Sequence, residues 1–320
     1  MLRKSNLIIF LFFIFFSRNI YGDIAFITNQ ESDKVDVIDL VKKKKVFQFN
    51  VGKKPAGITI DSTKKIIYVS NPESHNISKI DFKSKNHKFL YGGKSPMSLF
   101  YSTSKELLFV SNWYENKVSV VDTEQNIIIK ELKVGKSPAG IYISDENKKL
   151  FVANRDDNNV DVFDINNFKK IKTIKVGKAP FGIFSQPETH YVFVTNVQSG
   201  SISLINKVNL KVEKEIKVGS WPYQVALNKN KDIIYVTNQR DNSISIIDLN
   251  KKETVKTLNE ICEYPEGIDI SYNQKLIVVA CWFEDNIILL DLNSNELKNI
   301  ITVSGGPRSF GNFILEDNVR

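Results

Sequence analysis

The sequence predicts an all-β protein built as a seven-bladed β-propeller of four-stranded antiparallel blades. The proline of a phrase typified by VGSWP returns at intervals of 41 to 43 residues. Its seven copies are Pro55, Pro96, Pro138, Pro180, Pro222, Pro265 and Pro307. A second phrase, YVTN or a variant of it, also returns seven times, ending first at Asn29 and last at Cys281. Seven repeats of nearly equal length indicate a repeat architecture.

The repeat that begins at Pro138 shows the strands of one blade. The runs AGIYIS, KLFVAN, VDVFDI and KIKTIKV are rich in β-branched and aromatic residues, and polar clusters separate them. Such short runs between turn residues are typical of strands, and no segment has an apolar stripe at helical spacing. Four strands in about 42 residues are typical of a propeller blade.

Two recurrent residue types predict structural contacts. Glycine follows the proline by two places in four repeats, at Gly57, Gly140, Gly182 and Gly267. A strand that lacks side chains there is approached closely by other backbone, as expected of the innermost strands. An aspartate closes the third strand in six repeats, and we expect it to accept backbone N–H groups in the next turn. One aspartate per blade indicates a structural role and not a metal or catalytic site.

The two ends of the chain complement each other. The first repeat begins in mid-unit, at the second strand (24–29), and the last stops after a lone first strand (308–315). We expect residues 308–315 to supply the innermost strand of the blade whose other strands come from residues 24–50. This closure leaves no free sheet edge.

Residues 1–22 are predicted to be a secretory signal peptide, and residues 23–320 a single propeller domain. Arg3 and Lys4 precede an apolar run at 7–16, and Gly22 precedes Asp23. That run is shorter than the roughly 20 residues that span a bilayer, although an uncleaved anchor is the alternative. Cleavage reduces the formal net charge from +8 to +5, because three basic residues are removed. We expect a periplasmic or secreted monomer without a stable membrane span after cleavage.

The two cysteines, Cys262 and Cys281, are predicted to form a disulfide. They replace the usual glycine and asparagine of the same repeat, and they flank a hairpin that turns near residues 272–273. This arrangement places them almost opposite each other, and an exported protein meets an oxidising compartment. Two unpaired thiols are the alternative if the register holds the Cα atoms too far apart.

The repeat phrases resemble those of the YVTN-repeat β-propellers, close to the secreted bacterial YncE-like proteins. The resemblance covers residues 24–315, essentially the whole chain after the predicted signal peptide. It implies the propeller fold, and the YncE-like group also suggests DNA binding. It is less specific for function, because similar blades serve as binding modules, dehydrogenase-associated proteins and lactonase-like enzymes.

No local motif of a catalytic, metal or cofactor site is found. The histidines, His75, His87 and His190, fall in different phases of different repeats. No ligand cluster has zinc or copper spacing, and the nucleophile-elbow, HExxH, phosphate-loop and haem-attachment motifs are missing. We therefore expect no metal and no cofactor, and a binding protein more readily than an enzyme.

Two alternatives to a binding protein stay open. A lactonase-like hydrolase would act in the axial channel, and its site could be assembled from separate blades without a local motif. Glu266 and Arg308 are the only charged residues directly after the marker proline, where such a site would need them. An accessory protein of a periplasmic dehydrogenase is the other alternative, and it rests on the family resemblance alone.

The candidate binding residues lie in two loops of each repeat, one before the first strand and one after the second. Both loops open on the same face, because these two strands form one hairpin. Lysines of four consecutive repeats are expected to form a crescent on this face, beside two arginines and a group of aromatic residues. The predicted ligand-binding residues are Lys53, Lys94, Lys136, Lys178, Trp113, Tyr114, Arg155, Trp221, Tyr223, Arg240, Tyr264, Trp282 and Phe283.

Lysine beside aromatic platforms suits an anionic polymer with stackable units, such as single-stranded DNA. An acidic glycan or peptide fits the same pattern. The structural alternative is that the aromatic residues fill gaps between blades and that the lysines only keep the protein soluble. Acidic residues in the same loops, such as Glu73 and Glu115, dilute the positive potential.

Overall fold

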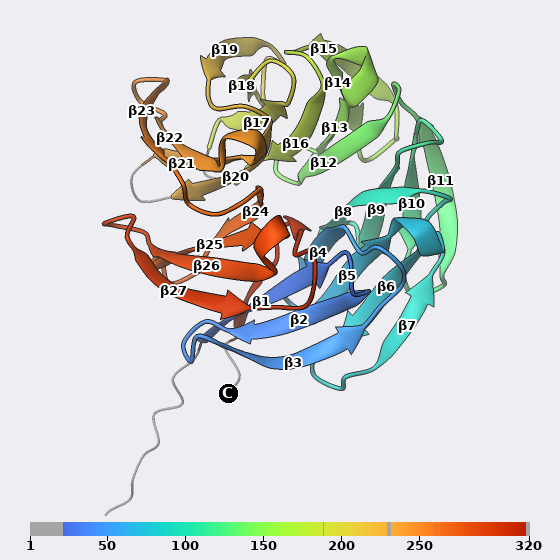
Figure 1. The fold of residues 1–320 in the computed structure, drawn as a ribbon. Coiled ribbons are helices and arrows are strands. Elements are labelled where there is room, and N and C mark those ends of the chain that lie inside the picture. The colour runs from blue at the N-terminus through green and yellow to red at the C-terminus, as the bar shows by residue number, and fades with distance from the viewer. Residues whose placement is uncertain (1–21, 188, 229–231, 318–320) are drawn as a thin grey trace, which may run out of the picture.

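The computed structural model describes residues 22–187, 189–228 and 232–317. They form seven mainly antiparallel sheets around a central axis, and the first blade lies beside the last (Figure 1). This arrangement confirms the predicted all-β, seven-bladed propeller. The predicted signal peptide lies, apart from Gly22, outside the described residues. Within the described ranges, no helix is long and apolar enough to cross a membrane.

Each blade runs from an innermost strand at the axis to an outermost strand at the periphery. The strands of the first three blades are β29 (Ile314–Asp317), β1 (Gly22–Asn29), β2 (Lys34–Asp39) and β3 (Lys44–Asn50); β4 (Gly57–Asp61), β5 (Ile66–Asn71), β6 (Asn76–Asp81) and β7 (His87–Leu90); β8 (Pro96–Ser102), β9 (Leu107–Asn112), β10 (Lys117–Asp122) and β11 (Ile127–Lys133).

The remaining four blades follow the same order without interruption. Their strands are β12 (Pro138–Ser144), β13 (Lys149–Asn154), β14 (Asn159–Asp164) and β15 (Lys170–Lys175); β16 (Pro180–Phe184), β17 (Tyr191–Asn196), β18 (Ser201–Asn206) and β19 (Val212–Lys217); β20 (Pro222–Asn228), β21 (Ile233–Asn238), β22 (Ser243–Asp248) and β23 (Glu253–Leu258); β24 (Pro265–Ile270), β25 (Leu276–Cys281), β26 (Asn286–Asp291) and β27 (Leu297–Thr302). Short 3₁₀ helices after four of the second strands are η1 (Pro72–Ser74), η2 (Arg155–Asp157), η3 (Gln239–Asp241) and η4 (Trp282–Glu284).

The C-terminal strand closes the first blade, as predicted. β29 pairs antiparallel with β1, so that Leu315 faces Ile24. The expected single strand 308–315 is nevertheless interrupted, because β28 (Phe310–Gly311) pairs in parallel with β4 of the second blade. In the last segment, Pro307 bridges to Asn29 of β1, and Ile314 pairs with Ala25. Between these two contacts the last segment has more residues than β1. The excess chain bulges toward the axis.

The YVTN phrase joins neighbouring blades. The hydroxyl of Thr237 donates to the backbone oxygen of Glu266 in the next blade at 2.7 Å, and that of Ser111 donates to Ala139 at 2.6 Å. The backbones approach so closely that a Cβ on Gly182 would lie 2.1 Å from the carbonyl oxygen of Tyr223. This contact explains the glycine predicted on the innermost strands.

The aspartates that close the third strands make the predicted turn contacts. Asp248 Oδ1, for example, accepts the backbone N–H groups of Asn250 at 2.9 Å and Lys251 at 3.1 Å. The same pattern occurs at Asp39, Asp81, Asp122, Asp164 and Asp291. These carboxylates are therefore turn formers, and the structural interpretation of their recurrence is confirmed.

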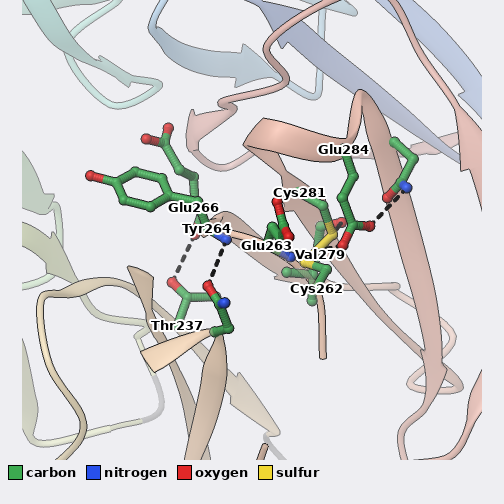
Figure 2. The surroundings of a disulfide bond; sticks show 10 residues. Thr237, Cys262, Glu263, Tyr264, Glu266, Val279, Cys281 and Glu284 are labelled. Carbon is green, nitrogen blue, oxygen red and sulfur yellow. Dashed lines mark hydrogen bonds between the residues drawn. A yellow bond between two sulfur atoms is a disulfide. The ribbon is translucent and has the colours of Figure 1, made fainter. Parts of the chain in front are cut away.

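The predicted disulfide between Cys262 and Cys281 is present, with the Cα atoms 5.8 Å apart (Figure 2). In other blades the two positions hold a glycine against an asparagine side chain. A Cβ on Gly219, for example, would lie 2.6 Å from Asn238 Cγ. The seventh blade replaces this tight contact by a covalent bond between the same two loops.

Candidate functional site

The two loops that carry the predicted binding residues lie side by side on one face, as expected. The backbone N–H of Trp282 donates to Tyr264 at 3.2 Å, and that of Gln239 donates to Trp221 at 3.0 Å. Trp221 and Tyr264 directly precede the marker prolines and have left-handed backbones, with φ of 57° and 58°. This sharp turn ends the outer loop and starts the innermost strand, so both side chains lie beside the channel mouth.

A pocket of about 510 Å³ lies at this mouth, and we call it the aromatic pocket. All three tryptophans of the chain and four other aromatic side chains line it. The lining residues are Gln30, Trp113, Arg155, Phe181, Val197, Trp221, Tyr223, Gln239, Tyr264, Glu266, Trp282, Phe283 and Arg308. Seven of the thirteen predicted binding residues are thus brought together from four different blades.

The rings of the aromatic pocket form two groups. Tyr264, Trp282 and Phe283 of the last blade make one wall, in which the centroids of Trp282 and Phe283 are 4.7 Å apart. Deeper in the pocket, the ring of Phe181 lies 5.1 Å from that of Tyr223. Tyr223, predicted as a loop residue, is buried there. The deeper rings therefore fill space between blades, while Phe283 on the wall is well exposed.

Charged groups make the floor of the aromatic pocket. Arg308 Nε donates to the Tyr223 hydroxyl at 2.8 Å and lies 3.3 Å from Glu266 Oε2. Gln239 Nε2 donates to Glu266 Oε1 at 2.9 Å. Burial raises the pKa of Glu266 to about 7, although the nearby Arg308 charge and the hydrogen bonds from Tyr223 and Gln239 oppose this effect. The floor therefore holds a carboxyl group that titrates near neutral pH beside a fixed positive charge.

Two arginines lie on the rim of the aromatic pocket, each over a tryptophan. The guanidinium of Arg240 is 3.4 Å from the ring centroid of Trp221, and that of Arg155 is 5.9 Å from that of Trp113. Arg155 also pairs with Asp156 at 2.7 Å. Arginine over an indole face is a favourable cation–π arrangement, so these contacts order the rim and keep positive charge near the opening.

The four lysines of the predicted crescent lie on exposed loops outside the aromatic pocket. Their backbones are held by side chains of the following loop. The N–H of Lys94 donates to Glu115 at 2.7 Å, and that of Lys136 donates to Asp157 at 2.8 Å. Acidic groups therefore lie close to the lysine positions. Tyr114 is exposed and also lies outside the pocket.

The channel is closed beneath the aromatic pocket. The bulge of the last strand places Phe310 and Gly311 at the axis, where only about 30 Å³ of space is enclosed. Gln224 holds the bulge, because its amide donates to Gly311 and accepts from it, at 2.9 and 3.1 Å. A ligand that enters from the loop face therefore meets a floor and not an open channel.

Six lining residues were absent from the predicted binding set. Glu266 and Arg308 carried a usable signal, since they are the only charged residues directly after the marker proline. The others, Gln30, Phe181, Val197 and Gln239, follow no pattern that distinguishes them from equivalent loop residues. Among the described residues, no group of three or more His, Cys, Asp or Glu could hold a metal ion.

The architecture defines the class of protein as a seven-bladed β-propeller, and comparisons with solved structures agree. The chain is similar to a functionally unknown protein from Desulfotomaculum acetoxidans, with a TM-score of 0.78, 13% identity and coverage of 89% of this chain and 98% of the other. It is also similar to the dihydro-heme d1 dehydrogenase NirN in complex with DHE, with a TM-score of 0.68, 12% identity and coverage of 92% and 75%.

A third similar structure is a streptogramin B lyase, with a TM-score of 0.70, 16% identity and coverage of 82% of this chain and 90% of the other. No protein-family model and no curated protein sequence matches the chain. Identities this low show the shared fold alone.

Proposed function

We propose that the protein is an exported, non-catalytic binding protein of the YVTN-repeat type. In this proposal, the aromatic pocket takes an anionic ligand with flat or apolar parts. The observation that carries it is the composition of the pocket, where seven aromatic rings line an open space of about 510 Å³. Ligand pockets typically have volumes of about 300–1,000 Å³ and a few polar groups that fix orientation.

The charge of the loop face favours an anion. Arg155 and Arg308 line the aromatic pocket, Arg240 lies over the ring of Trp221 beside it, and the exposed lysines of blades two to five lie farther out. An anionic polymer such as single-stranded DNA would stack a base on the rings while its phosphates contact the lysines. Base–aromatic stacking contributes about 1–3 kcal/mol per base. An acidic glycan or peptide would use the same charges.

A polarisation assay with a labelled oligothymidylate tests the polymer form of this proposal. We expect binding that weakens steeply with salt, because phosphate contacts release counterions. Lys94→Glu with Lys136→Glu should remove most of the binding, and Trp221→Ala the salt-independent part. The control, Lys130→Glu with Lys214→Glu, makes the same charge change on outermost strands and should have little effect. Equal binding by the wild type and the Lys94/Lys136 variant at low salt would reject the lysine crescent.

Export to the periplasm or the medium is part of the proposal. The Cys262–Cys281 bridge supports it, because disulfides persist mainly in oxidising compartments. Cell fractionation of the full chain, with mass determination of the mature N-terminus, tests this point. Mature protein that begins near Asp23 outside the cytoplasm is expected, and uncleaved protein in the membrane fraction would contradict it.

An enzymatic function is the second candidate, and Glu266 is the observation that favours it. A buried carboxyl with a pKa raised to about 7 is suited to acid–base chemistry, and Arg308 beside it could stabilise an oxyanion. Turnover of a lactone in a panel assay, lost in Glu266→Gln, would establish this activity. A role beside a periplasmic redox enzyme rests on the family resemblance and gains no support from the residues of the site.

A further inference from the structure

The floor of the aromatic pocket contains the guanidinium group of Arg308, only part of which is hydrogen-bonded. Among the described residues, Arg308 donates a single side-chain hydrogen bond, from Nε to the Tyr223 hydroxyl. Its two terminal nitrogens donate none to those residues. Arg308 lines the aromatic pocket, and 18% of its side chain is exposed to solvent. These nitrogens form the planar fork that binds carboxylates in a bidentate manner.

The position of this fork is fixed from three sides. Arg308 belongs to the chain segment that closes the first blade, Tyr223 lies on β20, and Glu266 lies on β24. The hydroxyl of Tyr223 and the carboxyl of Glu266 contact the same Nε atom, so the opposite edge of the guanidinium is directed away from them. An arginine held in this way loses little side-chain entropy when a ligand binds.

The carboxyl group of Glu266 is a second feature of the floor that indicates a ligand. Glu266 is 3% exposed, and its Oε1 atom accepts a hydrogen bond from Gln239, whereas its Oε2 atom has only the ion-pair contact with Arg308 Nε at 3.3 Å and no hydrogen bond of good geometry. A buried carboxylate oxygen whose only contact is a long ion pair is incompletely compensated, which is costly. If Oε2 carries a proton, the carboxyl instead becomes a hydrogen-bond donor beside the fork of Arg308. Figure 2 shows the Glu266 side chain directed away from the disulfide, alongside Tyr264.

We propose that Arg308 and Glu266 form a carboxylate-binding floor, and that the group entering the aromatic pocket is a flat aromatic monocarboxylate with its carboxylate directed inward. This inference rests on the proposed function and specifies the ligand class of the same pocket. The ring would lie among Trp221, Tyr264 and Trp282, and the carboxylate would accept from Arg308 and from protonated Glu266. A dianionic phosphate fits less well, because the floor offers one net positive charge at most.

The arrangement makes binding depend on pH. The charged and titratable groups that face Glu266 are Arg308, Tyr223 and Tyr264, and the pKa values of Tyr223 and Tyr264 are raised by burial. Near neutral pH only Glu266 therefore changes its charge. Its ionisation removes the donor and adds a negative charge beside the ligand. With a pKa of about 7, affinity for a carboxylate should fall about tenfold between pH 6 and pH 8.

Isothermal titration calorimetry with naphthalene-2-carboxylate, its primary amide and 2-naphthyl phosphate tests the inference. The carboxylate should bind at least tenfold more tightly than the amide and the phosphate at pH 6, and its affinity should fall toward pH 8 while that of the neutral amide does not. Glu266→Gln keeps a donor at every pH, so it should bind the carboxylate with an affinity that does not change between the two values. Arg308→Gln should reduce the preference for the carboxylate to less than threefold.

Asp269→Asn is the matched control. Burial also raises the pKa of Asp269 to about 7, but this residue lies on the other side of the channel closure and lines a different pocket. The control should therefore keep the tenfold pH dependence. Acid and amide that bind equally, or not at all, would overturn the carboxylate floor. If both bind equally and Trp221→Ala abolishes both, the aromatic pocket stands as a binding site and only the carboxylate inference fails.

Discussion

Removal of the Cys262–Cys281 bridge gives the sharpest test of what stabilises the propeller. The bridge spans a sequence separation of 19 residues. On the chain-entropy model, opening a loop of this length lowers the free energy of unfolding by about 3 kcal/mol. For a domain of about 300 residues, with an unfolding entropy near 2.1 cal/mol/K per residue, this corresponds to about 5 °C in Tm. Cys262→Ala with Cys281→Ala should therefore melt about 5 °C below the oxidised wild type.

A second double variant distinguishes the stabilising effect of the covalent bond from that of the packing at the two positions. Cys262→Gly with Cys281→Asn restores the pair that other blades hold at these positions, as in Gly135 and Asn154. The Oδ1 atom of Asn286 is buried and has no donor, whereas in the fourth blade Asn154 Nδ2 donates to the equivalent oxygen of Asn159. The new asparagine would supply that donor and regain about 1 kcal/mol.

Circular dichroism melts of both variants and of the wild type, with and without reductant, provide the measurement. The glycine–asparagine variant should lie between the alanine variant and the oxidised wild type. Reductant should lower the Tm of the wild type and leave both variants unchanged. An alanine variant that melts within 1 °C of the oxidised wild type would refute the assigned role of the bridge.

Three further predictions concern the fold and its pH dependence. Truncation after Gly306 removes β28 and β29 and should lower Tm sharply in a calorimetric scan; an unchanged Tm would contradict closure by the last strand. Gly182→Val should destabilise the chain by more than about 2 kcal/mol in urea, because its Cβ would lie 2.1 Å from a carbonyl oxygen of the next blade, whereas Gly305→Val, whose Cβ meets nothing closer than 3.5 Å, should cost less. The pKa of Glu266 is raised from 4.5 to about 7, so this group stabilises the folded protein most below pH 4.5, and its contribution to the free energy of unfolding falls, by up to about 3 kcal/mol, as the pH rises to 7. Glu266→Gln should flatten this part of the plot of stability against pH, and an unchanged plot would refute the raised pKa.

The fold was predictable because each repeat carries its own local signals. The hydroxyl residue of the YVTN phrase makes its contact with the next blade in five repeats, and the aspartate of the third strand makes its turn contact in six, so chance matches are excluded. The disulfide followed from the same regularity, since Cys262 and Cys281 are departures from a known pattern at paired positions. The interruption of the last strand by Phe310 and Gly311 was not predictable, because it occurs once and depends on pairing with a blade 250 residues away in sequence.

The candidate site was predictable as a face, but not as a pocket. Which loops share a face follows from hairpin topology, and this placed the tryptophans together correctly. The depth of each residue depends on packing between blades, so the burial of Tyr223 and the separation of Lys53 or Lys94 from the pocket needed the structure. The pairing of Glu266 with Arg308 joins the last blade to the C-terminal segment, and no local pattern encodes it.

The tryptophan side chains offer the most direct test of the central claim, that ligands bind in the aromatic pocket. The chain has three tryptophans, and all of them line this pocket. A ¹⁵N–¹H spectrum should therefore contain three indole signals that report on the site alone. Titration with naphthalene-2-carboxylate or with oligothymidylate is predicted to shift the signals of Trp221 and Trp282 saturably, and to leave backbone signals of the outermost strands unchanged. Indole signals that stay in place while backbone signals elsewhere shift would contradict the account.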